Sequence, residues 1–443
     1  IIWAPRTDRM GRLQFVAEAT PPEFPRLQRA ELIYDPRGES GEMQAHWHGP
    51  MAPGDIASRK KGAYADYMDK CTMAVNGIET TAALAPLVSI PAALADGWNR
   101  IEILTAHSPA VVISLQKFSG RRIVVPCPSA GDGRPSLDDV RRIFRQWHEG
   151  HETQRLAPGT WGSPAASVHC LCHDGVFHME PYAVACLAFD GQETFRTRIR
   201  ETCERMLAAQ RPAGWFPCHC AYSGGAPEPQ LGEGGAFTNG SVGEALALGA
   251  SVLGEPRYAE SSRRAADYGW YRWEDNQNYA AFALWHLAAL YEVEPRDEWL
   301  AKALYYARNF VTRDIGLCGA QDAHNFYSAY GNITLKGMAR LLGILPPDHH
   351  HRPVLRDQVI RFANQILSRQ QPDGWIAGRN RKYLGYRHSV PGLFSVARAL
   401  PELRGALEPA LCAMFRATAA RIQAAGAGAC SADDGLTIAC MGR

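Results

Sequence analysis

Three carboxylates in this sequence stand where apolar helical segments are about to begin. Asp275 is followed by Asn276, Asp322 stands two residues before His324, and Glu233 lies between glycines. A carboxyl group can act as a general acid or base when burial raises its pKa. Asp275, Asp322 and Glu233 are therefore candidate catalytic residues, with Glu233 as a second carboxylate opposite either aspartate. The alternative for the two aspartates is that they cap the helices they precede.

An imidazole and two phenols follow Asp322. They belong to His324, Tyr327 and Tyr330, and the two tyrosines share one face of a helix because they are three residues apart. Glycoside hydrolases use a carboxylate, an imidazole and a phenol, and so do lyases that cleave polysaccharides by β-elimination. His324 and Tyr330 are therefore candidate catalytic residues. The alternative is a helix cap with aromatic packing behind it.

A wider set of aromatic and basic residues predicts contacts with a charged sugar. Aromatic rings stack on the apolar faces of sugars, and arginine or histidine pairs with a uronate or sulfate. A solvated basic loop is the alternative for the last three members of the set. The predicted substrate-binding residues are Trp215, Trp273, Tyr327, Trp375, Arg379, Tyr386 and His388.

Two short clusters combine cysteine with histidine. They could assemble a zinc site, although neither has the spacing of a zinc ribbon. Disulfides or free thiols explain the same residues, and the sequence leaves these alternatives open. Cys430 and Cys440 could form a further disulfide. The candidate metal ligands are Cys170, Cys172, His173, Cys218, His219 and Cys220.

The elements that must position these residues repeat one unit of two helices. Two loops carry the same phrase, Q-x-P-x-G-W, at 210–215 and 370–375. Helical hairpins of fixed period bury their apolar faces only by stacking or by closing into a ring. With another helix near 136–150, the sequence predicts an (α/α) toroid of five or six hairpins. The predicted helix pairs are 174–188 with 192–209, 237–253 with 256–268, 276–293 with 297–312, 325–344 with 353–369, and 388–401 with 405–424.

The connections between these helices differ in length. Turns from the first to the second helix of a pair are short, as at Asp190-Gly191 and Gly254-Glu255. The return connections are long and contain the candidate residues above. Long loops are where binding residues accumulate, and in a ring they lie at one end. The sequence therefore predicts the site at that end.

The N-terminal third has a different pattern. Short apolar or alternating runs are separated by Gly, Pro and Asn turns, which is typical of antiparallel strands in a β-sandwich. We therefore predict a multidomain β + α protein, with a β-sandwich at 1–128, a linker at 129–135 and the toroid at 136–443. The segment Val75-Asn76-Gly77 with Gly97-Trp98-Asn99 resembles the jelly-roll accessory domains of carbohydrate-active enzymes.

Composition excludes several classes of function. A formal net charge of +2 gives no electrostatic footprint for a nucleic acid. The longest apolar stretches fall short of the ~20 residues that a membrane span requires. Twelve cysteines and a first residue other than methionine favour a periplasmic or extracellular location. The expected partner is therefore a carbohydrate substrate, and the oligomeric state is not predicted.

The toroid segment resembles the six-hairpin glycosidase superfamily, which includes unsaturated glucuronyl hydrolases and (α/α)-toroid polysaccharide lyases. The resemblance rests on the Q-x-P-x-G-W loops, on Asp275-Asn276, and on Asp322-Ala323-His324-Asn325 before Tyr330. It implies carbohydrate chemistry and places the inner-helix aspartate of the superfamily on Asp275 or Asp322.

We expect an enzyme that cleaves glycosidic bonds of an acidic, uronic-acid-containing oligo- or polysaccharide by acid/base hydrolysis, with no required cofactor. One alternative is a lyase acting by β-elimination through a tyrosine and histidine pair. The other is a non-catalytic, secreted sugar-binding or surface-assembly protein that keeps the toroid as a scaffold. The substrate sugar, the linkage and the stereochemical outcome are not predicted.

Overall fold

In the computed structural model the chain forms two compact units. The first comprises Ile1–Val124, Asp314–Phe326 and Ile360–Gln365, and the second comprises Val125–Arg313, Tyr327–Val359 and Ile366–Arg443. The residues described are strands β1 to β9 and the ranges 118–125, 133–161, 171, 174–189, 191–217, 236–268, 277–312, 315–316, 319–320, 330–376, 389–425 and 431–443.

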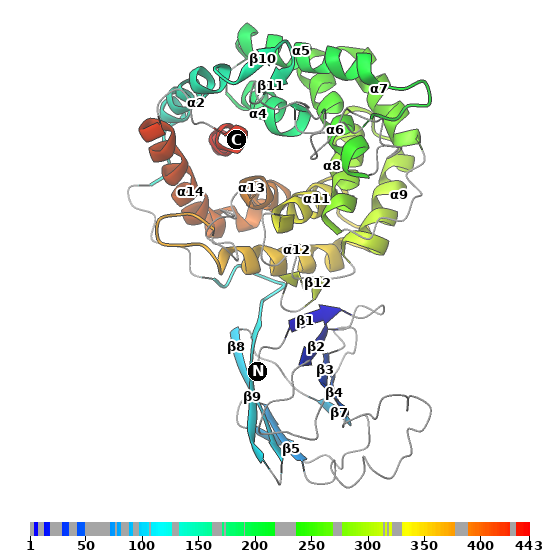
Figure 1. The fold of residues 1–443 in the computed structure, drawn as a ribbon, viewed down its shortest axis with the longest axis vertical. Coiled ribbons are helices and arrows are strands. Elements are labelled where there is room, and N and C mark those ends of the chain that lie inside the picture. The colour runs from blue at the N-terminus through cyan, green and yellow to red at the C-terminus, as the bar shows by residue number, and fades with distance from the viewer. Residues whose placement is uncertain are drawn as a thin grey trace, which may run out of the picture. The chain divides into compact units, whose positions relative to one another are not determined.

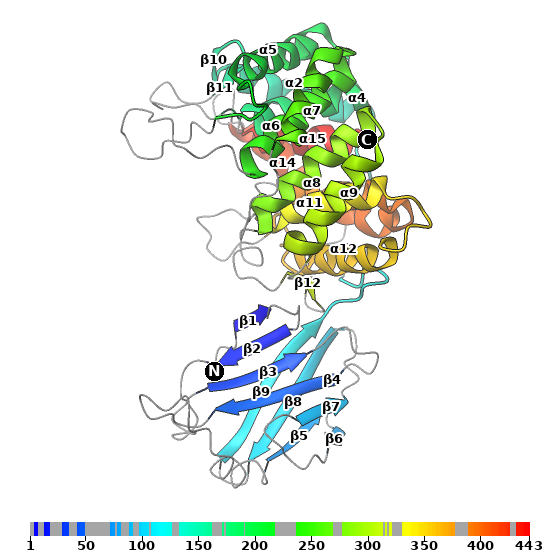
Figure 2. The ribbon, with the colours of Figure 1, turned by 90° about the vertical axis from the view of Figure 1, so that its right-hand side faces the viewer.

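The first unit contains two antiparallel sheets in its described strands (Figure 2). In one of these sheets, β8 (Gly97–Thr105) and β9 (Ser108–Lys117) pair along most of their length, with Ile101 opposite Ile113. The strands occur where the sequence alternates, whereas the packing of the two sheets as a sandwich stays a prediction. One sheet has the order β1 (Ala4–Thr7), β2 (Leu13–Ala17), β3 (Arg29–Tyr34), β4 (Glu42–His48) and β7 (Val88–Pro91), and the other β6 (Ile78–Thr80), β5 (Cys71–Val75), β8 (Gly97–Thr105) and β9 (Ser108–Lys117).

The second unit is a ring of two helical layers (Figure 1). Among the described residues, each helix of the inner layer contacts the next one along the chain. The last inner helix, α15 (Ala432–Met441), contacts the first, α4 (Glu180–Ala188), so the inner layer forms a closed ring. The predicted toroid is confirmed. The inner helices are α4 (Glu180–Ala188), α6 (Ala236–Leu253), α8 (Gln277–Val293), α11 (Tyr330–Ile344), α13 (Ser389–Ala399) and α15 (Ala432–Met441), and the outer helices are α2 (Leu137–Glu152), α5 (Glu193–Ala209), α7 (Pro256–Asp267), α9 (Asp297–Tyr306), α12 (Arg352–Leu367) and α14 (Arg404–Ala425).

Apolar patterning separates the two layers. The inner helix α8 is buried on nearly every side, and Phe282 and Trp285 are each about 1% exposed. The outer helix α2 is amphipathic, because its buried residues Val140, Ile143 and Trp147 recur at helical spacing. A helix that is apolar all round must lie between other elements, whereas an amphipathic helix needs only one covered face. The sequence pattern therefore assigns each helix to its layer.

The ring has two different ends, because its connections alternate in length. Only two residues separate α6 from α7, and three separate α8 from α9. The connections from α5 to α6 and from α7 to α8 are much longer. We call the end where the inner helices begin the long-loop end, and the end where they finish the short-turn end.

The sixth hairpin is complete, which the sequence left open. Its inner helix is the C-terminal α15, which contacts α2, α4 and α14. The Trp147 indole of α2 donates a hydrogen bond of 2.8 Å to the Ser431 carbonyl, and a Cβ at Gly435 would lie 2.3 Å from the Trp147 ring. Cys440 is a free thiol on α15, so the disulfide predicted between Cys430 and Cys440 is wrong.

The Q-x-P-x-G-W phrases form matching turns that fasten one outer helix to the next. Gln210 donates to the Gly214 carbonyl at 2.8 Å and to the Ser261 carbonyl of α7 at 2.9 Å. Gln370 makes the same two bonds, to the Gly374 and Ala410 carbonyls. A third turn lacks the glutamine but has the same glycine. In all three turns this glycine has a positive φ and lies against a backbone carbonyl of the following outer helix. The three glycines are Gly159, Gly214 and Gly374.

Replacing Gly435 with alanine should destabilise the ring, because the added methyl group overlaps the buried Trp147 indole. We expect a loss of about 1–3 kcal/mol in the free energy of unfolding, measured by urea titration. Gly405→Ala is the control, since a Cβ there meets nothing within 4 Å. That change should be neutral or stabilising by up to about 1 kcal/mol. Equal effects of the two substitutions would contradict closure of the ring through Trp147.

Candidate functional site

Most of the predicted site residues lie outside the described residues. Tyr330, Trp215 and Trp375 are described. In sequence, the remaining predicted catalytic and substrate-binding residues stand in the connections that enter α6, α8, α11 and α13, which belong to the long-loop end. The predicted residues outside the described part are Glu233, Trp273, Asp275, Asp322, His324, Tyr327, Arg379, Tyr386, His388, Cys170, Cys172, His173, Cys218, His219 and Cys220.

Aromatic side chains are exposed at the long-loop end. Tyr279, in the first turn of α8, is 39% exposed, and Tyr330, the first residue of α11, is 38% exposed. Phe237, in the first turn of α6, stacks on Tyr279 with ring centroids 5.2 Å apart. Solvent-accessible aromatic rings suit the apolar side of a sugar ring.

The two tryptophans of the Q-x-P-x-G-W turns are half-buried. Arg211 lies over the Trp215 ring at 5.7 Å, and Tyr268 packs beside that ring. Arg421 lies over the Trp375 ring at 5.9 Å. Each tryptophan thus helps to hold its turn, and a role in substrate binding stays a prediction.

A chain of hydrogen-bonded rings lies where α2 packs on the beginning of α4. His178 Nδ1 is 2.8 Å from His151 Nε2, and His151 Nδ1 is 3.0 Å from the Tyr182 hydroxyl. His148 Nδ1 also reaches that hydroxyl at 3.0 Å. His178 belongs to a π-helical turn, Asp174–Met179, a conformation that is frequent at functional sites. The sequence analysis missed this chain, because its members come from separate helices.

The electrostatic environment favours the neutral forms of His151 and Tyr182. Burial, together with the neighbouring His178 and His148, lowers the pKa of His151 well below its ordinary value. Burial likewise raises the pKa of Tyr182, and the nearby Glu152 carboxylate adds to that rise. Glu152 itself is held by Arg198 at 2.7 Å. Neutral imidazoles and a phenol in hydrogen-bond contact are able to pass a proton along the chain toward His178.

An ion pair crosses the centre of the ring. Lys336 of α11 contacts Glu180 of α4 at 2.6 Å and Glu244 of α6 at 3.2 Å. In the inner layer, two helices separate α4 from α11 on either side, so this contact spans the bore (Figure 1). The Lys336 ammonium also lies 3.6 Å from the centre of the Trp285 ring. The three charged side chains are at most 7% exposed.

Further charges extend this cluster toward the short-turn end. Arg340 pairs with Glu244 and, at 3.1 Å, with Glu292, which also binds Arg398 at 2.9 Å. Burial raises the pKa of Glu244, and the charges of Lys336 and Arg340 oppose that rise. Buried charges require such partners because desolvation of a lone charge costs several kcal/mol. The cluster thus fixes the positions of the inner helices.

The described residues hold no group of three or more His, Cys, Asp or Glu side chains able to bind a metal ion. The predicted zinc ligands lie outside those residues, so the zinc hypothesis stays a prediction. Among the helices described, none is both long and apolar enough to cross a membrane.

No protein-family model and no curated protein matches this sequence. Among solved structures, an unsaturated glucuronyl hydrolase from Streptococcus agalactiae is similar, with a TM-score of 0.50 and 11% identity over 74% of this chain and 98% of that one. A polysaccharide lyase is similar with a TM-score of 0.50 and 12% identity, over 70% of this chain and 97% of that one. The chain thus has the same (α/α)-toroid fold as these two structures, as the sequence predicted.

Acid should destabilise the fold because its buried histidines are neutral. Burial lowers the pKa of His286 to about 3, whereas an unfolded histidine titrates near 6.5. The unfolded state therefore binds more protons below about pH 6.5. The free energy of unfolding that neutral His286 contributes is fully present above about pH 6.5, and it is lost as the pH falls toward the pKa of His286 in the folded protein. Between about pH 7.5 and 5 we expect a loss of about 2 kcal/mol from His286, measured by urea unfolding.

His286→Gln is the test variant for this pH dependence. Its free energy of unfolding should fall by about 2 kcal/mol less than that of the wild type over the same pH interval. Parallel pH profiles for the two proteins would show that His286 does not carry the effect.

Removing the charge that crosses the bore should be costly. Lys336→Met leaves the carboxylates of Glu180 and Glu244 buried without their cation, so we expect a loss of about 3–5 kcal/mol in stability. The matched control is Lys302→Met. Lys302 also lies over a tryptophan and pairs with two carboxylates, but it is 17% exposed. Its loss should cost about 1 kcal/mol or less.

Adding Glu180→Gln to Lys336→Met should recover part of the stability, because one unpaired charge is removed. Thermal unfolding of the three variants measures this. If Lys336→Met and Lys302→Met were equally mild, the ion pair across the bore would not be a determinant of the fold.

Proposed function

We propose that this protein is a carbohydrate-active enzyme that cleaves glycosidic bonds in an acidic, uronic-acid-containing oligo- or polysaccharide by hydrolysis. The observation that carries the proposal is the set of exposed aromatic side chains at the long-loop end of the ring. Tyr279 and Tyr330 are each more than a third exposed there, and each follows a candidate carboxylate closely in sequence. Aromatic platforms beside carboxylates are the composition of a saccharide site.

Asp275 stands two residues before α8, and Asp322 stands in the connection that enters α11. One would protonate the leaving oxygen and the other would activate water, with Glu233 as the alternative partner. Arg379 and His388, in the connection before α13, suit the carboxylate of a uronate as hydrogen-bond donors. His324 and Tyr330 would orient the same sugar. No cofactor is required for this chemistry.

The similar solved structures support carbohydrate chemistry in general. One is named an unsaturated glucuronyl hydrolase and the other a polysaccharide lyase. Proteins with this ring thus act on saccharides through more than one reaction. We further propose that the N-terminal sheets form a jelly-roll-like accessory sandwich, and that the protein acts in the periplasm or outside the cell.

The lyase alternative is favoured by one observation. Tyr330 is 38% exposed at the first residue of α11, where a phenol is accessible to a substrate, and His324 precedes it closely in sequence. In β-elimination one of these two groups would remove the proton from the ring carbon that bears the carboxylate. The bond to the glycosidic oxygen at the neighbouring carbon would break, and the other group would protonate that leaving oxygen. The product then contains a carbon–carbon double bond conjugated to the carboxylate, which absorbs in the ultraviolet.

Asp275→Asn and Asp322→Asn should each lower kcat/KM on uronic-acid oligosaccharides by about 10²–10⁴-fold, because each removes a proton-transfer group. Cleavage is measured by release of reducing ends, with ultraviolet absorbance followed in parallel. Asp348→Asn is the control, since Asp348 is exposed in the connection after α11 at the short-turn end. It should retain full activity.

The two readouts separate the alternatives. Reducing ends without ultraviolet absorbance support the hydrolase, whereas growth of absorbance that is lost in Tyr330→Phe supports the lyase. Binding of uronic-acid glycans without any turnover would support the third hypothesis, a non-catalytic sugar-binding protein that keeps the toroid as a scaffold. Full activity in both aspartate variants would remove Asp275 and Asp322 from the site.

A further inference from the structure

A cavity of 560 Å³ occupies the bore on the short-turn side of the Lys336–Glu180 ion pair. It lies at the opposite end of the inner helices from the proposed catalytic site. Each of the six inner helices described above contributes side chains to the cavity wall, and most of these side chains are small or aliphatic. Representative wall residues, one from each helix, are Val184, Ala247, Ala289, Ala339, Ala397 and Met441.

The cavity has the size and wall chemistry of a ligand site. Pockets for small molecules typically measure about 300–1,000 Å³ and are lined by apolar side chains with a few polar groups. Here the small side chains of the inner helices leave the space, and Glu180 and Lys336 close it toward the middle of the ring. The wall therefore suits the apolar body of a ligand.

Positive charge exceeds negative charge where the cavity opens at the short-turn end. Arg398 shares Glu292 with Arg340. Arg404 donates to a main-chain oxygen of Arg443, at 3.2 Å. Within the described part of the chain, the Arg443 guanidinium has no hydrogen bond or ion pair, although it lies in the same cavity wall. Burial and the neighbouring Arg398 lower the pKa of Arg443, so these cations are crowded.

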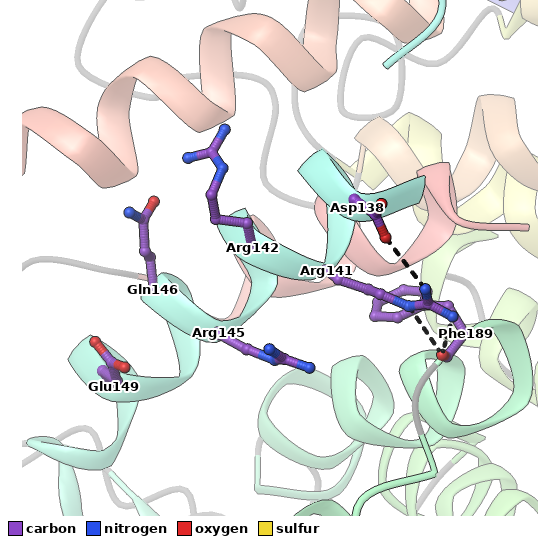
Figure 3. A pocket seen from close by; sticks show the side chains of 7 residues that line it. All are labelled: Asp138, Arg141, Arg142, Arg145, Gln146, Glu149 and Phe189. Carbon is purple, nitrogen blue, oxygen red and sulfur yellow. Dashed lines mark hydrogen bonds and ion pairs between the residues drawn. The ribbon is translucent and has the colours of Figure 1, made fainter. Parts of the chain in front are cut away.

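Arginines of the outer helices bind main-chain oxygens at the C-terminal ends of inner helices, and Arg404 of α14 does so at the end of α15. The same arrangement occurs at three other inner helices. Arg141 donates to the Phe189 carbonyl at 3.1 Å (Figure 3), Arg196 to that of Val252 at 3.1 Å, and Arg352 to that of Leu345 at 2.6 Å.

A shallower pocket on α2 is also rich in arginine, but it differs in its charge balance. Figure 3 shows Arg141 directed at Asp138 and at the Phe189 carbonyl. Arg142 pairs with Asp139 at 3.0 Å. Two arginines of that surface therefore already have carboxylate partners, whereas in the bore cavity Arg404 donates to a main-chain oxygen, and the Arg443 guanidinium has no hydrogen bond within the described part of the chain.

We propose that this cavity binds a small organic anion with an apolar body. The acidic group would pair with Arg404 and Arg443 at the mouth, and the apolar part would fill the space between Ala247, Ala339 and Val184. A guanidinium pair binds a carboxylate or sulfonate strongly because charge-assisted hydrogen bonds form in a partly desolvated place. This site is separate from the proposed catalytic site and does not depend on its activity.

The test uses 8-anilinonaphthalene-1-sulfonate, a fluorescent sulfonate with an apolar body, titrated into the full-length folded protein. We expect one binding site per chain with a Kd on the order of 10 µM. Octanoate should displace the probe. Octylammonium, which has the same tail and the opposite charge, should not displace it.

Three variants locate the binding. Arg404→Gln combined with Arg443→Gln should weaken binding of the probe at least tenfold. Gly343→Leu should abolish it by filling the cavity, since a Cβ at Gly343 meets only Ala399, at 3.8 Å. Arg356→Gln is the control and should bind normally, because Arg356 lies outside the cavity and pairs with Glu402.

Circular dichroism and the melting temperature show whether each variant is folded. If Gly343→Leu does not fold, the double variant Arg404→Gln with Arg443→Gln tests the proposal. Absence of saturable binding to the wild type would overturn the proposal. Equal displacement by octylammonium, or unchanged binding in the folded variants, would also overturn it. Glycan cleavage is measured separately, so its failure would leave this result intact.

Discussion

The Lys336 ammonium in the middle of the ring is the interaction on which the rest of the structure depends. Its ion pairs with Glu180 and Glu244 join α11 to α4, across the bore, and to α6, which is next to α4. The ammonium also lies over the face of the Trp285 ring. Each of these charges would be costly to bury alone, and together they satisfy one another only when the inner helices are in one register. Apolar packing closes the ring, and this cluster determines how the helices are aligned along its axis.

The same ion pair divides the bore into two compartments with different chemistry. At the long-loop end, Tyr279 and Tyr330 expose aromatic faces beside the connections that carry the candidate carboxylates. At the short-turn end, apolar walls lead to a mouth with Arg404 and Arg443. Because Lys336 and Glu180 separate the two compartments, ligands at the two ends would not share contacts. The proposed catalytic site and the proposed anion site would thus lie on opposite sides of this ion pair.

Local signals in the sequence predicted most of the ring. Ser136 caps α2 as its position before two aspartates indicates, and its hydroxyl accepts from the Asp139 amide. The helix pairs follow the apolar spacing, and the short turns lie where Gly and Pro interrupt it. The Q-x-P-x-G-W phrase indicated a repeat, but sequence could not show that Gln210 fastens its turn to α7, because Ser261 is distant in the chain.

Periodicity and turn residues in the sequence were enough to predict the helices between residues 136 and 425, the layer of each hairpin helix, and the end of the ring with the long connections. These properties follow from periodicity and turn residues, which act over a few neighbouring positions. Only the tertiary structure decided that α15 completes the ring against Trp147, and that Glu180 meets Lys336 across the bore. The physical reason is that a buried charge or a close helix contact depends on partners that are far apart in the chain, and no local pattern specifies those partners.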